Sequence, residues 1–173
     1  MDTHQIDSIL TFLCEELGGD WFLTGGSLVR LKFDAHRGTE DMDLVRIRDE
    51  LQSEERSRTR LFEWLMQHNL GPEWVNTAVE PFVKRVPNWE SEVIELRAGR
   101  IGRVFRPNLT FFIYLKLGRA TSADWKDIEK AIPHCLEGFD WKKFEEWATE
   151  KVKPHIPRLL TLLPERHKFK RLN

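Results

Sequence analysis

The apolar residues in the first fifty positions recur with two different periods. Up to about residue 17 they are spaced three and four apart, which predicts an amphipathic helix that Asp2 or Thr3 can cap and Gly18-Gly19 ends. Residues 21–24 form a short apolar run between glycines, as expected of a buried strand. Residues 41–47 alternate between polar and apolar, which predicts a second strand. The intervening Gly25-Gly26-Ser27 predicts a tight turn before a short helix.

The pattern then changes along the chain. Residues 49–69 predict a charged helix, and residues 73–106 predict strands and turns that include a hairpin of 91–97 with 103–106. Helices are expected over 109–119, 122–136 and 140–151, and a last short helix after the prolines that follow. This order predicts an α+β fold, a small mixed sheet flanked by helices with a helical C-terminal half. At 173 residues we expect a single domain, with an α/β core over 1–106 and a helical part over 107–173 packed on it.

Composition narrows the classes of partner. Lys and Arg number 27 against 28 Asp and Glu, so the net charge of −1 provides no general attraction to nucleic acid or an acidic membrane. Binding of that kind would need a local basic patch. Two stretches qualify, and we favour the hairpin for an RNA or phosphate contact and a solvated surface for the tail. The hairpin carries Arg97, Arg100, Arg103 and Arg106, and the tail carries Arg166, Lys168, Lys170 and Arg171.

Cysteine usage and hydropathy indicate a cytoplasmic protein. Cys14 and Cys135 are far apart and outside any zinc-like spacing, so we expect two reduced, buried thiols. The first residues lack the basic start and apolar run of a signal peptide, and no stretch approaches the roughly 18 apolar residues of a membrane span.

The candidate chemistry comes from the glycine turn and an Asp-x-Asp pair close behind it. Alternate side chains of a strand point to the same face, so Asp41 and Asp43 should project together while Met42 and Leu44 face a core. Two adjacent carboxylates repel one another, and a hard cation such as Mg²⁺ relieves this while also binding substrate phosphates. The glycine turn offers backbone N–H groups that can approach a phosphate closely. Each motif alone is common, but the pair together predicts a nucleotide–metal site.

These residues carry a family resemblance. The stretch FLTGGSLVRLKFDAHRGTEDMDLV resembles the polymerase-β-like nucleotidyltransferase superfamily. Its pattern GGS…R…R-x-T-x-D-x-D-L is similar to the minimal bacterial branch, which includes nucleotidyltransferase toxins of abortive-infection-type toxin–antitoxin systems. A later stretch, FIYLKLGRATSADWKDIEKAI, is similar to the Lys…Lys-Asp motif of that branch, with Lys116 and Asp127 at the matching positions.

The resemblance implies a role for each matching residue. Ser27, Arg30 and the Gly25-Gly26 backbone would hold the triphosphate. Asp41 and Asp43 would bind Mg²⁺, with Mn²⁺ as an alternative. Lys116 would contact phosphate and Asp127 would line the site. From the residues alone, a lysine in an apolar helix can equally be snorkelling to the surface, and Asp127 can be an ordinary helix-surface acid.

The third carboxylate of active superfamily members has no clear counterpart here. Glu95 is the best candidate as metal ligand or base, with Glu92 and Glu80 behind it. Where the branch commonly carries a second acid three residues after its Lys-Asp, this chain has Lys130. Two hypotheses follow. The first is a Mg²⁺-dependent nucleotidyltransferase that moves a nucleoside monophosphate from an NTP to a hydroxyl of RNA, protein or a small molecule, as a possible toxin–antitoxin component with a cognate partner protein. The second is a catalytically inactive relative that binds a nucleotide or a partner as a regulator.

Overall fold

A computed structural model describes residues 1–48 and 53–165 of the chain. The tail cations Arg166, Lys168, Lys170 and Arg171 therefore lie outside the described residues, as does the start of the helix expected over 49–69. Residue contacts divide the chain into two compact units, Met1–Arg106 and Pro107–Asn173. The fold class is mixed α+β, with every strand in the first unit.

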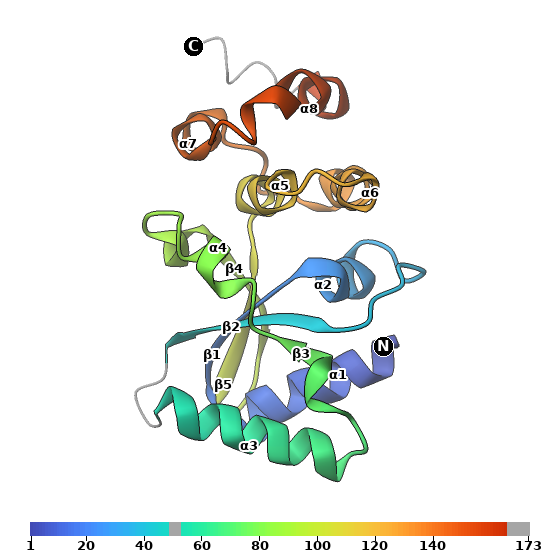
Figure 1. Ribbon diagram of the computed structural model, residues 1–173, viewed down its shortest axis with the longest axis vertical. Helices are drawn as coiled ribbons and strands as arrows, with labels where there is room; N and C mark the ends of the chain where they lie inside the picture. Colours follow the sequence, from blue (N-terminus) through green and yellow to red (C-terminus); the bar gives the residue numbers. More distant parts are fainter. Residues whose placement is uncertain (49–52, 166–173) are drawn as a thin grey trace. The chain divides into compact units, whose positions relative to one another are not determined.

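A five-stranded mixed sheet organises the first unit (Figure 1). Its strands lie in the order β3-β2-β1-β5-β4. They span Gly19–Thr24 (β1), Met42–Arg48 (β2), Val75–Asn76 (β3), Val93–Ala98 (β4) and Gly102–Pro107 (β5). β1 runs antiparallel to β2 and parallel to β5, and β2 runs parallel to β3. The central strand β1 is buried from Trp21 onward, and Phe22 and Leu23 are completely buried.

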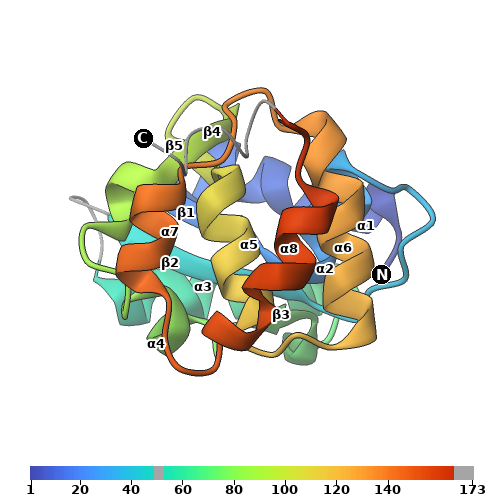
Figure 2. The same cartoon turned by 90° about the horizontal axis from the view of Figure 1, so that it is seen from above.

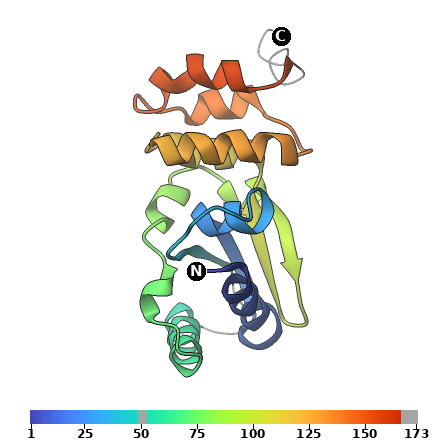
Figure 3. The same ribbon diagram turned by 90° about the vertical axis from the view of Figure 1, so that its right-hand side faces the viewer.

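Helices cover the sheet of the first unit. They are α1 (Thr3–Phe12), α2 (Gly25–Lys32), α3 (Glu54–Gln67) and the single turn α4 (Glu80–Val83). Asp2 caps α1 in a reciprocal capping box with Gln5, and a π-helical turn, Leu13–Leu17, extends it. α1 and α3 lie side by side (Figures 1 and 3), joined by the stacked rings of Phe12 and Trp64 at 4.7 Å.

The second unit is a small helical bundle. It contains α5 (Leu109–Leu117), α6 (Ser122–Ala131), α7 (Trp141–Trp147) and α8 (Ile156–Leu162). Seen from above, α5 lies between α7 and α6 (Figure 2), and aromatic pairs join the helices. Trp147 of α7 meets Phe111 and Tyr114 of α5, each at 5.9 Å. Arg158 of α8 lies 4.2 Å from the ring of Trp125 on α6.

Candidate functional site

The glycine turn of the sequence is the first turn of a helix rather than a separate loop. α2 begins at Gly25, directly after β1, and not at Leu28 as the pattern predicted. Gly25 has φ +74°, a backbone conformation that side chains disfavour. A Cβ atom at Gly25 would lie 1.8 Å from Oδ2 of Asp43. Glycine at this position therefore allows an aspartate to sit against the start of a helix, where backbone N–H groups have no partner within the helix.

Asp43 stands at the end of β2 beside that helix start. It pairs with Thr24 of β1 on one side and with Asn76 of β3 on the other. Its Oδ1 accepts a hydrogen bond of 3.0 Å from Nδ2 of Asn76. Met42 and Leu44 are completely buried while Asp43 is half-buried, so the alternation inferred from the sequence is present.

Asp41 lies one residue before β2 begins, and it is half-buried. Its carbonyl oxygen accepts a hydrogen bond of 3.0 Å from the hydroxyl of Thr39. Among residues 1–48 and 53–165, no three His, Cys, Asp or Glu side chains come together as a metal-binding group. The candidate metal ligands are thus the carboxylates of Asp41 and Asp43, since Asn76 turns its NH2 group toward Asp43 and its Oδ1 accepts from the backbone N–H of Ala78. Oxygen donors of this kind suit Mg²⁺, which commonly binds one or two carboxylates and completes its shell with water and phosphate.

The loop before β2 folds over the start of α2. A Cβ atom at Gly26 would lie 2.9 Å from Oγ1 of Thr39 and 3.8 Å from Nη2 of Arg37. Nη1 of Arg30 donates a hydrogen bond of 2.9 Å to the carbonyl of Arg37 and so fixes this loop. Nε of Arg30 is buried and has no hydrogen-bond partner among the described residues. The motif Arg37-x-Thr39 therefore brings a cation and a hydroxyl to the glycine turn.

Ser27 contributes differently from the sequence expectation. Its side chain is completely buried, and its hydroxyl is 3.4 Å from the carbonyl oxygen of Thr24, to which it donates. The hydroxyl is thus used within the fold, which leaves the backbone N–H of Ser27 as its means of contacting a phosphate.

Lys116 and Asp127 lie together inside the helical unit. Nζ of Lys116 is 2.6 Å from Oδ2 of Asp127 and 3.5 Å from Oδ1 of Asp124, and all three side chains are buried. Lys116 and Asp127, the two matching residues of the later stretch, thus pair with each other. The third member, Asp124, was missed, although its place in the capping box with Thr121 is readable from the sequence. Snorkelling to the surface is ruled out for Lys116, since only 4% of the residue is exposed.

Asp124 is the most strongly bonded member of this buried cluster. Burial alone would raise the pKa of Asp124, but hydrogen bonds from Thr121 and Arg119 and the charge of Lys116 together bring it below its usual value. The bonds measure 2.7 Å from the Thr121 hydroxyl and 2.8 Å from the Arg119 guanidinium. Asp124 is therefore ionised at neutral pH.

The structure does not bring Glu95 to Asp43. Glu95 is exposed on β4, and β1 and β5 lie between β4 and β2. Three strand spacings correspond to roughly 14 Å, which is too far for the two side chains to share a metal ion. Glu92 is buried and accepts a hydrogen bond from the Ser91 hydroxyl. Glu80 is ion-paired with Lys84 and lines a pocket with Leu44, whose side chain leaves β2 on the face opposite to Asp43.

The hairpin arginines are bonded within the protein. Arg97 is ion-paired with Asp7 and also reaches the hydroxyl of Thr11. Arg103 makes two hydrogen bonds to Asp20, of 2.9 and 2.6 Å. Arg100 donates to the carbonyl of Glu15 at 3.2 Å. These bonds tie the hairpin to α1, to the π-helical turn after it and to β1, and the expected contact of its arginines with RNA or phosphate stays a prediction.

Comparisons with known proteins add no assignment. No protein-family model, no curated protein and no solved structure matches the chain. No helix within the described part of the chain is long and apolar enough to cross a membrane.

Proposed function

We propose that the protein is a Mg²⁺-dependent nucleotidyltransferase that transfers a nucleoside monophosphate from an NTP to a hydroxyl group. The observation that supports this most strongly is the contact between Gly25 and Asp43. It places a carboxylate directly against the start of α2, so a metal-binding group and phosphate-binding N–H groups share one small region. Asp41, two residues before Asp43 along the chain, would supply the second carboxylate.

The chemistry is one of positioning and charge. The acceptor hydroxyl attacks the α-phosphorus, a new P–O bond forms, and the bond to the β-phosphate breaks with release of pyrophosphate. Asp41 and Asp43 would hold the metal, which when bound neutralises charge on the phosphate oxygens. The N–H groups of Gly26 and Ser27 would orient the triphosphate, with Arg37 close to the same turn. The hydroxyl proton passes to a carboxylate or to water.

We propose a hydroxyl of RNA, of a protein or of a small molecule as the acceptor, the range that the resemblance to the nucleotidyltransferase superfamily allows. A role in a toxin–antitoxin system with a cognate partner protein follows from the same resemblance. Growth arrest on expression in a bacterial host, lost with Asp43→Asn, would support it.

A direct assay tests the enzymatic proposal. The purified protein is incubated with Mg²⁺ and each α-³²P-labelled NTP, with total bacterial RNA or with protein alone, and label transfer and pyrophosphate are measured. We expect transfer from at least one NTP, and a loss of about 100-fold or more in Asp43→Asn, since charge stabilisation of this kind is typically worth that much. Glu63→Gln, an exposed acid on α3, removes one charge elsewhere and should keep wild-type activity.

One observation favours the alternative, an inactive nucleotidyltransferase-like regulator. The side chain beside Asp43 on the neighbouring strand is the amide of Asn76, not a third carboxylate. If Mg²⁺ and an NTP bind in a manner that Asp43→Asn abolishes, but no acceptor is ever labelled, the regulator is the better account. If neither binds, both proposals fail.

A further inference from the structure

The strand β4 forms an open edge of the sheet in the first unit. Within residues 1–48 and 53–165 it pairs with β5 on one side, and no strand pairs with its other side (Figure 3, the yellow-green strand at the right of the sheet). It is six residues long, and its apolar residues Ile94 and Leu96 are only half-buried. A strand edge of this kind presents a row of backbone N–H and C=O groups with which a further strand can pair.

One hydrogen bond at the end of the hairpin shows which backbone groups of β4 face outward. The N–H of Gly99 donates to the carbonyl of Gly102 at 2.9 Å, so the backbone groups of Gly99 point toward β5. Successive residues of an antiparallel pair alternate between pointing to the partner strand and pointing away from it. The N–H and C=O groups of Ile94, Leu96 and Ala98 consequently point outward. None of these three residues is proline, so each offers both a donor and an acceptor.

The side chains of β4 separate into a charged face and an apolar face. Arg97 is ion-paired with Asp7 of α1 and donates to the hydroxyl of Thr11 at 3.1 Å, so it lies on the face that α1 covers. Glu95, two residues earlier in the strand, lies on the same face and is exposed. The bonds to α1 hold the guanidinium of Arg97 in place while 32% of its side chain remains exposed. The three residues whose backbone groups point outward lie on the opposite face and are apolar.

The charges of β4 favour one pairing of the strand with a second copy of itself. An antiparallel pair about a two-fold axis can be centred on Glu95, on Leu96 or on Arg97, and the outward backbone groups allow all three. Centring on Glu95 places two glutamates opposite each other, and centring on Arg97 places two arginines opposite each other, so both arrangements are repulsive. Centring on Leu96 places Glu95 of each copy opposite Arg97 of the other. This arrangement replaces like-charge repulsion with two attractive pairs.

We infer that the protein forms a two-fold dimer in which two copies of β4 pair antiparallel, with Glu95 of each copy opposite Arg97 of the other. The sheet then continues from one copy into the next. On the apolar face Leu96 meets its own copy, and Ile94 meets Ala98, which covers side chains that a single chain leaves half-exposed. This inference does not depend on the proposed nucleotidyltransferase activity, because β1 and β5 separate β4 from the strand that carries Asp43.

Sedimentation velocity of the full-length protein tests the dimer over a range of about 1–500 µM, which spans weak and moderate affinities. We expect a reversible monomer–dimer equilibrium that weakens as salt is added, since ion pairs at an exposed edge are screened. Glu95→Arg places arginines opposite each other at two points of the dimer, so it should raise the dissociation constant about ten-fold or more. Glu63→Arg makes the same change of charge on α3, away from β4, and should stay within about two-fold of wild type.

A mixture of two variants tests the register of the pair. Arg97→Glu by itself places glutamates opposite each other and should also weaken the dimer about ten-fold or more. An equimolar mixture of Arg97→Glu and Glu95→Arg restores both opposite-charge pairs, so it should associate more tightly than either variant alone. Circular dichroism checks that each variant is folded, because Arg97→Glu also removes the ion pair with Asp7.

If Arg97→Glu does not fold, Leu96→Pro decides instead. Proline at position 96 removes an outward N–H that the inferred pair uses, without removing a bond to β5, and should abolish the dimer. The inference is overturned if the wild-type protein stays monomeric over the whole range, which would leave the edge to a strand of another protein. It is equally overturned if Glu95→Arg or Leu96→Pro dimerises as well as wild type, or if the folded mixture associates no better than its components.

Discussion

At the scale of single residues, Lys116 shows how burial changes the meaning of a side chain. The sequence suggests that Lys116→Ala would affect nucleotide binding more than stability. In the structure the amino group of Lys116 lies 2.6 Å from Asp127 and 3.5 Å from Asp124, and all three side chains are buried. Removing it leaves two carboxylates without that partner in a site with little access to water, which is costly.

We therefore expect Lys116→Ala to lower the free energy of unfolding by about 3–5 kcal/mol, the usual cost of removing one partner of a buried ion pair. Urea denaturation at pH 7 measures it. Lys130→Ala, an exposed lysine on α6, serves as the control and should change stability by less than about 0.5 kcal/mol. A loss below about 1 kcal/mol in Lys116→Ala would show that the cluster contributes little.

The pH dependence gives an independent check of the same cluster. The folded pKa of Asp124 is lowered, so its contribution to stability is fully present above the ordinary value of about 4. It is lost as the pH falls through the lower folded pKa. The stability difference between wild type and Asp124→Asn should consequently shrink as the pH falls below about 4. A difference that stays constant over this range would mean that the charge of Asp124 is not what stabilises the cluster.

At the scale of elements, the β4–β5 hairpin is locked onto the end of the first helix. The amide of Ile101 donates to the carbonyl of Cys14 at 3.1 Å, within the π-helical turn after α1. A Cβ atom at Gly102 would lie 2.4 Å from the carbonyl oxygen of Leu13 and 3.1 Å from that of Gly19. The close approach of three backbone segments therefore requires glycine at this position.

We expect Gly102→Ala to destabilise the protein by about 1–3 kcal/mol, because the new methyl group meets backbone atoms that cannot rotate away. Thermal unfolding followed by circular dichroism measures the change. Gly118→Ala is the matched control, since its Cβ atom would find no neighbour closer than 3.4 Å. Equal Tm values for the two variants would show that the hairpin can shift at no cost.

At the scale of the whole molecule, the proposed function predicts a stability that depends on ligand. A ligand that binds only the folded state raises the unfolding free energy by about 2.7 kcal/mol at one hundred times its Kd. For a chain of this size that corresponds to a rise in Tm of about 5–10 °C. We expect Mg²⁺ with an NTP to produce it, and either alone to produce less.

Asp43→Asn separates this effect from general stabilisation by salt or nucleotide. The variant should fold, because an asparagine oxygen can still accept the bond from Asn76, and it should lose the shift. An equal NTP-dependent shift in wild type and Asp43→Asn would refute the candidate site.

The sequence by itself determined the local features of this protein. Periodicity located the helix after Asp2, the alternating strand around Asp43 and the change to helical patterning at Asn108, next to the boundary between the two units. These predictions of helix and strand positions are right because such elements depend on residues a few positions apart, and the spacing of apolar and capping residues is visible in the sequence. The closeness of Gly25 to Asp43 could also be predicted from the sequence, because Gly25 directly follows β1 and Asp43 lies on the next strand along the chain.

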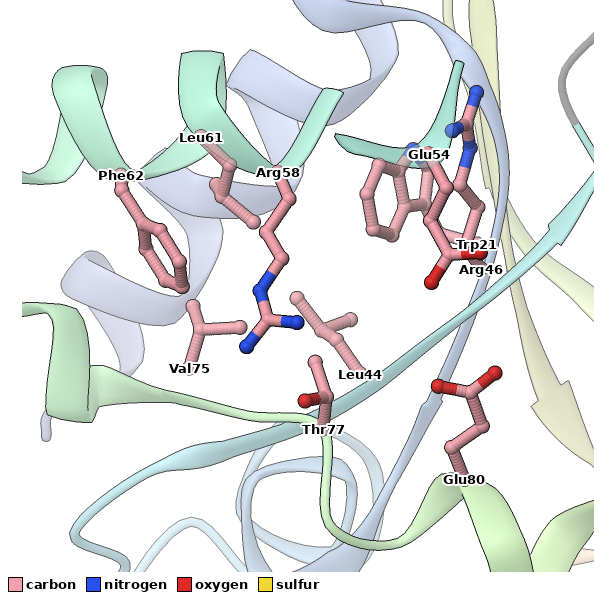
Figure 4. A pocket seen from close by; sticks show the side chains of 10 residues that line it. All are labelled: Trp21, Leu44, Arg46, Glu54, Arg58, Leu61, Phe62, Val75, Thr77 and Glu80. Carbon is pink, nitrogen blue, oxygen red and sulfur yellow. The ribbon is translucent and has the colours of Figure 1, made fainter. Parts of the chain in front are cut away.

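Only the tertiary structure decided which distant residues meet. The strand order, which no local pattern predicts, separates Glu95 on β4 from Asp43 on β2 and places Asn76 beside Asp43. The fold also brings an acid to each of two hairpin arginines, Asp7 of α1 to Arg97 and Asp20 of β1 to Arg103, and no local pattern predicts these pairs. The side chains around Leu44, on the face of β2 opposite to Asp43, come from five elements, β1, β2, β3, α3 and α4, which no short stretch of sequence brings together (Figure 4). The strand order and these pairs depend on contacts between residues far apart in the sequence. Such contacts result from packing over the whole unit, and no short stretch of sequence contains the information for them.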